Sequence, residues 1–421
     1  MKRVYFDHNA TTAVEPAVLE AMLPYFSGEF GNASSIHTFG QSARAAVESA
    51  RDQVAALIGS RPQEIVFTSG GTEADNHAIF GVVRAAINDR RGAIGRERSN
   101  ELDARYPNRL QSPKAPHVIA TAIEHEAVLN SCQALENESV EVTYIAPDGA
   151  GRVDPGSIRG ALRAETVLIT VMHANNELGT IQALEEIGKI AAEADVYFHT
   201  DAVQSAGKIP INVDAMKIDL LSLSGHKIYA PKGVGALYVR GATRVQQILY
   251  GGHHQRGFRP GTENVAAIVG LGKAAEIARA SLAADLARVC GLRDELERGL
   301  LARVADARVN GAGTARTPNT TNITFAGIEG EALVIALDLK DLACSTGAAC
   351  SSGAVEPSHV LTAIGLSAAD ARASLRFSLG RHTTPEEIAF ALEVIPAAVA
   401  KLRELSPVYG KTAASLLNPL K

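Results

Sequence analysis

The chain has 421 residues, of which 46% are hydrophobic and 21% are charged, and this globular composition excludes a disordered chain and a membrane-spanning protein. Its 41 Lys and Arg residues against 46 Asp and Glu residues give a net charge of −5, which argues against a nucleic-acid surface and a basic membrane patch. We expect small molecules or proteins as partners, and the length predicts two domains or three.

The start of the chain and its cysteines indicate the compartment. Polar and charged residues in MKRVYFDHNATT precede any apolar signal region, and no apolar run approaches the about 18 residues of a membrane span. The four cysteines are too sparse for a disulfide scaffold and contain no C-x-x-C pair; they are Cys132, Cys290, Cys344 and Cys350. We therefore expect a cytoplasmic protein with free thiols.

The first two thirds of the chain alternate short apolar runs with segments of helical periodicity, which predicts βα units stacked into a largely parallel sheet. The predicted strands are 64–69, 117–123, 140–146, 166–172, 196–200, 219–224 and 235–239. The predicted helices between them include 74–87, 127–137 and 184–194. The polar segment 88–116 interrupts this rhythm, and we interpret it as a solvated excursion.

A long Ala- and Leu-rich helix without proline is predicted from about residue 264 to 303, as a connector into a smaller α/β unit. The predicted parts of that unit are strands at 322–326 and 373–379, a helix at 329–339 and a final helix. The final helix opens with TPEE at 384–387, a capping box with proline at the first helical position.

Five polar clusters each follow the carboxyl end of a predicted strand, which is the edge where open parallel sheets bind ligands. The clusters are 68–73, 124–126, 175–177, 200–204 and 222–227. Residues 69–72 lead directly into a helix, whose N-terminus favours an anion such as phosphate. An ordinary glycine turn with a cap explains this loop equally well.

Lys227 and Asp201 give the clusters a more specific interpretation. Pyridoxal phosphate needs a lysine, an anion at its pyridine nitrogen and a phosphate cradle. Lys227, Asp201 and the loop at 69–72 offer these three from different strands. The alternatives are an ion pair between Asp201 and Lys227 without a cofactor, or a lysine that only binds phosphate or ends a loop.

The remaining polar candidates each allow a functional and a structural interpretation. His125 is suited to lie on a cofactor ring and move protons, or it is an ordinary polar residue with its hydrogen bonds satisfied. Asn176 and Gln204 are suited to bind the phenolic oxygen of the cofactor, although loop amides more often close turns. Arg376, within an apolar strand, is suited to capture a substrate carboxylate or to form a buried ion pair.

Two of the cysteines lie in a Gly- and Ser-rich segment. Its composition is typical of a mobile loop and makes Cys344 and Cys350 candidate nucleophiles, between which spacing alone does not choose. Cys132 and Cys290 lie on predicted helices, where we expect ordinary thiols. No cysteine has a sulfur or histidine neighbour at ligand spacing, so we expect no metal site.

Ten motifs extend over nearly the whole chain. They are YFDHNATT (5–12), FGNASSIHTFG (30–40), FTSGGTEADN (67–76), IEHEAV (123–128), MHANNELGT (172–180), HTDAVQSAGK (199–208), SLSGHKIYAPKGVGALYV (222–239), GGHHQRGFRPGTEN (251–264), ACSSGAVEPSHVL (349–361) and RFSLGRHTTPEE (376–387). With these motifs in this order, the chain resembles the cysteine desulfurases of the NifS and IscS type, which are pyridoxal-phosphate enzymes of the class-V aminotransferase group.

The resemblance implies an α/β fold of the fold type I class. A large domain at 14–263 would carry a mainly parallel seven-stranded sheet, and a small domain would combine residues 1–13 and 264–421. Lys227 would bind the cofactor covalently, Asp201 would contact its pyridine nitrogen and His125 would stack on its ring. Gln204 and Asn176 would bind the phenolic oxygen of the cofactor. Its phosphate would be held by Gly71, Thr72, Ser224 and His226, with Thr262 from the second subunit. Arg376 would bind the substrate carboxylate, and Cys350 would be the nucleophile.

The activity implied is removal of sulfur from L-cysteine, which yields L-alanine and a persulfide on Cys350. A homodimer would pass this sulfur to an iron–sulfur scaffold or another acceptor protein, and the C-terminal tail is more NifS-like than IscS-like. The alternatives are a selenocysteine lyase, a class-V aminotransferase, or a sulfur- or metal-carrying scaffold with a vestigial cofactor site.

Overall fold

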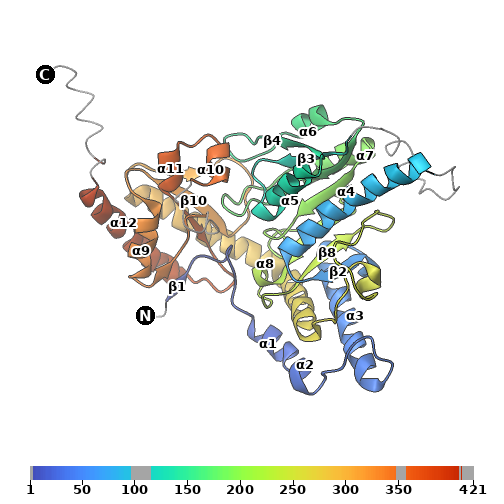
Figure 1. Cartoon of the computed structure of the whole chain (residues 1–421). Helices are drawn as coiled ribbons and strands as arrows, with labels where there is room; N and C mark the ends of the chain where they lie inside the picture. Colours follow the sequence, from blue (N-terminus) through green and yellow to red (C-terminus); the bar gives the residue numbers. More distant parts are fainter. Residues whose placement is uncertain (1–2, 96–114, 348–356, 407–408, 410–421) are drawn as a thin grey trace.

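The computed structural model describes residues 3–95, 115–347, 357–406 and 409. Figure 1 shows a large sheet flanked by helices and a smaller sheet beside it, with the long helix α8 (Val265–Arg303) reaching from one to the other. This arrangement confirms the predicted α/β class.

The large sheet has seven strands in the order β2-β8-β7-β6-β5-β3-β4. Only β8 runs antiparallel to its neighbours, β2 and β7. The strands are β2 (Ile65–Thr68), β3 (His117–Thr121), β4 (Glu141–Ile145), β5 (Thr166–Thr170), β6 (Tyr197–Asp201), β7 (Leu220–Ser224) and β8 (Gly235–Val239). The predicted mainly parallel, seven-stranded sheet is confirmed, and each predicted strand agrees with the observed one to within two residues at either end.

Helices cover both faces of the large sheet. Successive side chains along a strand point to opposite faces, so alternate residues of each strand pack in different cores. Ile119 and Phe67 belong to one core and Val118 and Val66 to the other. The first core is shared with α3 (Thr38–Ile58), α6 (Pro155–Ala161), α7 (Leu184–Glu193) and the first half of α8. The second is shared with α4 (Gly71–Gly95) and α5 (Glu126–Asn137).

The helix α4 ends later than predicted. It continues past residue 87 to Gly95, so the first part of the segment predicted as a solvated excursion is helical. The rest of that segment up to residue 114 lies outside the described residues.

The smaller sheet has the antiparallel order β12-β10-β9. Its strands are β9 (Ala307–Asn310), β10 (Thr320–Phe325) and β12 (Ser374–Ser378), and a separate parallel pair joins β1 (Val4–Tyr5) to β11 (Leu342–Ala343). The helices of this part are α9 (Gly330–Asp338), α10 (His359–Ala363), α11 (Ala368–Arg372) and α12 (Pro385–Leu405). The predicted capping box of α12 is confirmed, because the side chains of Thr384 and Glu387 each accept from the other's backbone N–H.

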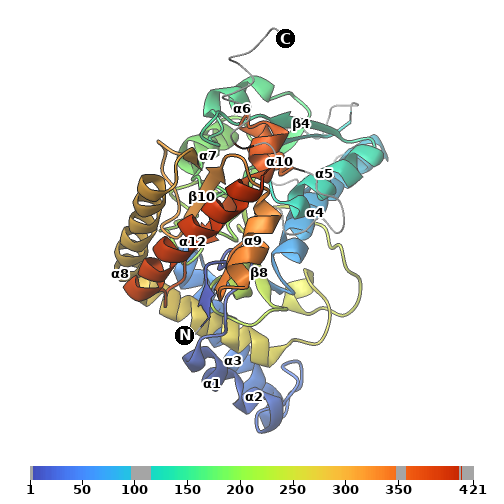
Figure 2. The same ribbon diagram turned by 90° about the vertical axis from the view of Figure 1, so that its left-hand side faces the viewer.

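The helix α8 contributes to two separate cores. Leu271 in its first half packs in the core of the large sheet, whereas Leu292 and Leu296 pack with β10 and β12. Figure 2 shows α12 and α9 beside each other over the small sheet. The predicted domain boundary at residue 263 comes two residues before α8 and stays a prediction.

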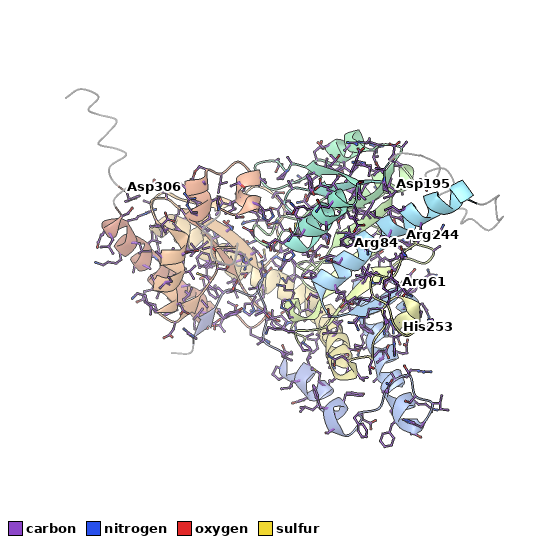
Figure 3. All side chains as sticks on the ribbon, viewed as in Figure 1. Arg61, Arg84, Asp195, Arg244, His253 and Asp306 are labelled. Atoms are coloured by element: carbon purple, nitrogen blue, oxygen red, sulfur yellow. The ribbon has the colours of Figure 1, made fainter. Side chains whose placement is uncertain are left out.

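The carboxyl ends of the large sheet's parallel strands point toward the small sheet. Asp195, just before β6, lies at the end of the molecule away from Asp306, which precedes β9 of the small sheet (Figure 3). The chain start runs between the two sheets, through α1 (Pro16–Met22) and α2 (Pro24–Ser27) to α3. Within the described ranges, no helix has both the length and the apolarity to span a bilayer.

Candidate active site

Three of the predicted site residues lie at the carboxyl ends of strands in the large sheet. Asp201 is the last residue of β6, and Lys227 ends the short helix η3 (Gly225–Lys227), which directly follows β7. His125 follows β3 and is the N-cap of α5. Because β6 and β7 pair in parallel, their ends bring Asp201 and Lys227 to one edge.

Lys227 is partly buried against the chain start. Its Nζ donates to the backbone oxygens of Asn9 at 2.6 Å and Ala10 at 2.8 Å. Both acceptors are uncharged, so the lysine is held in place without a carboxylate in either of these bonds. These two bonds position the Lys227 amine at the edge where β6 and β7 end.

Asp201 is buried, with 5% of its surface exposed. Its Oδ1 accepts from the backbone N–H of Val203 at 2.8 Å. Burial raises the pKa of this carboxyl, and the nearby charges of His125 and Lys227 partly oppose that rise. A buried carboxyl of this kind is stabilised as an anion by a cation, and a protonated pyridine nitrogen is such a cation.

His125 is oriented by the helix that it caps. Its Nδ1 accepts from the backbone N–H of Ala127 at 3.1 Å, which places the proton of the neutral ring on Nε2. His125 and Thr72 line a common cavity of about 320 Å³ between the starts of α4 and α5. The residues predicted to meet the cofactor ring and its phosphate therefore border one space.

Gly71 begins α4 and lies close to the loop that follows β6. A Cβ atom on Gly71 would lie 2.7 Å from Cγ2 of Val203, so the close approach of the Val203 side chain to the Gly71 backbone favours glycine here. The N-terminus of the 25-residue α4 supplies the positive end of a helix dipole at this point. This cradle suits a phosphate group.

Two further residues predicted at the phosphate lie near the same edge. Ser224 is the buried last residue of β7. The Nδ1 of His226 lies 3.1 Å from Oγ1 of Thr11. Burial, followed by the charge of Lys227, lowers the pKa of His226 to about 4, so His226 is a neutral hydrogen-bonding group at pH 7. Thr262 is exposed on the segment before α8.

The two predicted amides contact the chain start and the small sheet. Gln204 donates from Nε2 to the backbone oxygen of Asn9 at 2.9 Å. The backbone oxygen of Asn176 accepts from Nδ2 of Asn9 at 3.0 Å and from Nη1 of Arg376 at 3.1 Å. These bonds join loops of the large sheet to β12 through the chain start.

Arg376 lies within β12 and is 3% exposed. Its Nη2 lies 2.7 Å from Oδ1 of Asp7, so the structural alternative, a buried ion pair, is present. Its Nε is buried and has no hydrogen-bond partner among the described residues. The guanidinium thus combines a structural pair with an unused donor.

The described cysteines differ from what a nucleophile requires. Cys344 is 8% exposed, and burial raises the pKa of its thiol far above the usual value. Cys132 is fully buried, and its thiol pKa is raised to about 12. Cys290 is half-buried on α8. Cys350 lies outside the described residues, and the burial of Cys344 argues against the other candidate in that segment.

Asn9 is a site residue that the sequence analysis missed. It connects Lys227 and Gln204 through its backbone oxygen, and its side chain bonds the backbone oxygen of Asn176. It also bonds three residues of the small-sheet side, Asn319, Thr320 and Ser378. The motif YFDHNATT contains it, but nothing in the residue type reveals contacts to partners up to 369 positions away.

Glu124 was also missed, although it is next to His125. Its Oε1 accepts from the hydroxyl of Thr121 at 2.6 Å and from the backbone N–H of Met172 at 2.8 Å. Its Oε2 is buried without a partner among the described residues. Burial raises the pKa of Glu124 to about 8, so this carboxyl holds a proton at neutral pH.

Comparison with known proteins identifies the family. A sequence profile described as aminotransferase class-V matches residues 4–98 and 97–390. The chain belongs to the class-V aminotransferase family. It is 48% identical over 409 residues to a protein of Anaeromyxobacter dehalogenans named cysteine desulfurase IscS, an alignment that covers 96% of this chain and 95% of that protein.

Other relatives and solved structures agree with this placement. Cysteine desulfurase 1 of Trichormus variabilis is 48% identical over 407 residues, covering 97% of this chain and 95% of the relative. The solved structure of a NifS-like protein superimposes with a TM-score of 0.82 at 32% identity, covering 95% of this chain and all of that one. The solved structure of SspA in complex with cysteine superimposes with a TM-score of 0.75 at 37% identity. The match covers 90% of this chain and all of that one.

Proposed function

We propose that this protein is a cysteine desulfurase that converts L-cysteine to L-alanine with pyridoxal phosphate as cofactor and leaves the sulfur as a persulfide on Cys350. The observation that carries the proposal is the placement of Lys227, Asp201 and His125 at the carboxyl ends of β7, β6 and β3, where the charges of His125 and Lys227 act on the Asp201 carboxyl. The names of relatives that align over nearly the whole chain support the same activity.

The residues at this edge fit pyridoxal phosphate. Lys227 would bind it covalently, Asp201 would hold its ring nitrogen and His125 would lie on the ring. The glycine cradle at Gly71 and the start of α4 suit the phosphate, with Thr72, Ser224 and His226 as further donors and Thr262 reaching it from a second subunit. Gln204 and Asn176 would hold the phenolic oxygen. The cofactor supplies an electron sink for the bonds at the substrate Cα.

The residues of the chain perform the remaining chemistry. The Lys227 amine leaves the backbone oxygens of Asn9 and Ala10 and takes the proton from the substrate Cα. The Arg376 guanidinium holds the substrate carboxylate through its available donor. His125, with its proton on Nε2, is placed to donate at the reacting end of the substrate.

The sulfur transfer balances with Cys350 as acceptor. The Cys350 thiolate attacks the substrate sulfur, an S–S bond forms and the Cβ–S bond of the substrate breaks. The three-carbon fragment takes up one proton at Cβ, which replaces the proton that Cys350 lost on ionisation, regains the Cα proton from Lys227 and leaves as L-alanine, while the enzyme keeps one extra sulfur. No external oxidant or reductant is required.

The test is alanine release from L-cysteine by the Cys350→Ala variant, with mass spectrometry to locate the extra sulfur. We expect alanine release to stop and the persulfide to be absent in Cys350→Ala, and both to persist in the control Cys290→Ala. An aminotransferase has no use for Cys350, so full activity in Cys350→Ala would refute the proposal. A protein that stays colourless with pyridoxal phosphate would refute the cofactor assignment and favour a scaffold role.

We also propose that the protein is a homodimer. The elements α1 and α2 and the start of α3 lie at the lower end of Figure 1. They and the segments between them carry several exposed apolar side chains, which are Leu19, Leu23, Phe26, Phe30, Ile36 and Phe39. A patch of this kind marks an interaction surface, and a second copy would also bring its own Thr262 toward a phosphate. We expect Phe26→Glu to halve the mass measured by light scattering, whereas Leu405→Glu on α12 leaves it unchanged.

The destination of the sulfur follows from the same proposal. A persulfide must pass to an acceptor protein, and an iron–sulfur scaffold is the acceptor that we propose. Such chemistry needs free thiols, which a reducing cytoplasm maintains. Incubation of the persulfide form with an apo-scaffold, ferrous iron and a reductant, which supplies the electrons that convert persulfide sulfur to sulfide, but without added sulfide tests this step. Cluster absorbance on the scaffold is expected; if no cluster forms and the sulfur is found on another acceptor instead, the proposal is refuted.

A further inference from the structure

An ion pair holds the segment before α8 against the glycine cradle at the start of α4. Nε of Arg259 donates to Oε1 of Glu73 at 2.8 Å, and its Nη2 donates to Oε2 at 3.3 Å. Glu73 lies in the first turn of α4, and its Oε2 also accepts from the backbone N–H of Ser69 at 2.8 Å. One carboxylate therefore joins Arg259 to the loop that leads into the cradle.

The pair is largely shielded from water. The side chain of Glu73 is 13% exposed and that of Arg259 is 26% exposed. Burial alone would raise the pKa of Glu73, but the hydrogen bonds from Arg259 and Ser69 lower it below the usual value. Glu73 is therefore an anion at pH 7, and water screens its charge only in part.

The segment that carries Arg259 is itself fixed to β2, the strand that directly precedes the cradle. Gln255 is buried, and its Oε1 accepts from the backbone N–H of Phe67 in β2 and from Nη1 of Arg51, each at 3.0 Å. Gln255 and the residue after it have φ angles of 48° and 56°, a conformation that is unfavourable for residues with a Cβ and that persists only where the surroundings hold it. Arg259 therefore approaches Glu73 from a segment with a defined conformation.

The position of Glu73 is electrostatically unfavourable for an anionic ligand. The N-terminus of α4 attracts phosphate through its free backbone N–H groups and its dipole. A carboxylate in the same turn repels a phosphate dianion and competes for those N–H groups. A guanidinium bound through two nitrogens neutralises this carboxylate and keeps it on the Ser69 side of the turn.

We propose that Arg259 is a positioning residue for the cofactor phosphate, because by neutralising Glu73 and holding it on the Ser69 N–H it keeps the start of α4 open to a dianion. Arg259 acts through Glu73 and is not itself one of the proposed phosphate donors. The inference rests on the proposed function only in placing a phosphate at this cradle. An ion pair that merely stabilises the loop is the alternative, and its loss would weaken ligands with and without a phosphate alike.

The test measures ligand binding without turnover. The full chain, freed of any bound pyridoxal phosphate, is titrated by calorimetry with pyridoxine 5′-phosphate and with pyridoxine, neither of which has the aldehyde that reacts with a lysine. In Arg259→Gln, we expect Kd for the phosphate ester to rise by about 10-fold or more, because the unpaired Glu73 carboxylate repels the dianion. Kd for pyridoxine, which lacks the phosphate, should stay within about twofold of the wild-type value.

A second substitution distinguishes charge from loop structure. Combining Arg259→Gln with Glu73→Gln removes the unpaired charge and keeps an oxygen for the Ser69 N–H, so the affinity for pyridoxine 5′-phosphate should return close to the wild-type value. Arg84→Gln is the matched control, because it breaks another Arg–Glu pair of α4, with Glu138 at 3.1 Å. It should change neither Kd.

The proposal is overturned if Arg259→Gln weakens both ligands equally or neither of them, or if the double variant binds the phosphate ester as weakly as the single one. If Arg259→Gln does not fold, Glu73→Gln alone decides. It leaves an unneutralised cation beside the cradle, so the phosphate ester should bind more tightly, and unchanged or weaker binding contradicts the proposal.

Failure of the proposed function gives different results. A wild-type chain that binds neither compound would overturn the cofactor assignment and this inference with it. Alanine release by Cys350→Ala would overturn the desulfurase proposal and leave these affinities unaffected.

Discussion

Two buried polar clusters in this molecule differ in how completely their hydrogen bonds are satisfied. On the small sheet, Asn310 of β9 bonds Asn322, Thr324 and Ser374 at 2.7–3.2 Å. Thr324 and Ser374 also bond each other at 2.8 Å, and no side-chain atom of these four is left without a partner. In the cleft, by contrast, Arg376 Nε and Glu124 Oε2 are buried and have no partner in the described part of the chain.

The difference separates a structural network from a functional one. In the Asn310 cluster, neutral donors and acceptors satisfy one another, which fixes the strand register and leaves no donor or acceptor available for a ligand. The cleft instead combines unsatisfied atoms with shifted pKa values, at Asp201, Glu124 and Lys208, and such combinations mark sites that handle charge. Four predictions test this contrast, in order of decreasing effect.

The largest effect is expected for Lys227→Ala. Loss of the amine removes both the covalent attachment and the proton acceptor, so alanine release from L-cysteine should fall by about 10⁴-fold or more. The visible absorbance of the bound cofactor should be lost as well. Lys189→Ala, on the exposed side of α7, is the control, and equal activity in the two variants would remove Lys227 from the mechanism.

Arg376→Ala should raise KM for L-cysteine by about 100-fold, because a charge-assisted hydrogen bond to a carboxylate contributes about 3 kcal/mol. It should also lower the unfolding free energy, since it leaves Asp7 without its partner. Asp7→Asn weakens the same pair without removing the guanidinium, so it should lower stability with little change in KM. If KM is unchanged in Arg376→Ala, the arginine is structural only.

The Glu124→Gln variant should change how stability depends on pH. The pKa of Glu124 is about 8 in the folded protein and near 4.3 in an unfolded chain, so the folded state binds the extra proton between these values. Stability contributed by this group is therefore complete below about pH 4 and falls as the pH rises toward 8. Relative to Glu124→Gln, the wild type should lose roughly 2–3 kcal/mol between pH 5.5 and 7.5, measured by urea unfolding; parallel curves would contradict the shift.

Asn310→Ala should have the smallest effect and one confined to stability. It leaves several buried oxygens without a donor, which costs about 1–3 kcal/mol, while kcat/KM per folded molecule stays unchanged. Arg308→Ala, on the same strand but with a side chain 48% exposed, should cost about 1 kcal/mol or less. A loss of turnover in Asn310→Ala would break the distinction between the two clusters.

The sequence predicted the part of the site that depends on local pattern. Apolar runs located β6 and β7, and because parallel strands end at one edge, Asp201 and Lys227 were expected to meet there. The close approach of Val203 to Gly71 could not be predicted, because the sequence shows only that residue 71 is a glycine. The strand β9 was missed because ARVN is short and only partly buried, so its periodicity carries little signal.

Contacts between distant segments were beyond sequence reasoning. The pairing of Arg376 with Asp7 spans 369 positions, and the sequence analysis could only offer an ion pair and a carboxylate clamp as alternatives. Likewise, small neighbours around Cys344 suggested an accessible thiol, whereas β11 and the core beneath it bury that side chain. Burial is set by the tertiary fold and not by the composition of the flanking residues.

The position of Asn9 has a consequence for how the protein is made. Asn9 is held by Asn319, Thr320 and Ser378, which follow it by 310 to 369 positions, so the ribosome synthesises Asn9 long before these partners. The large sheet can form while the chain is still growing, but the Lys227 side of the cleft must wait for the last strand. Until β12 is made, a nascent chain lacks one of the partners of Asn9, so the Asn9 backbone oxygen that accepts from Lys227 is not yet fully held in place.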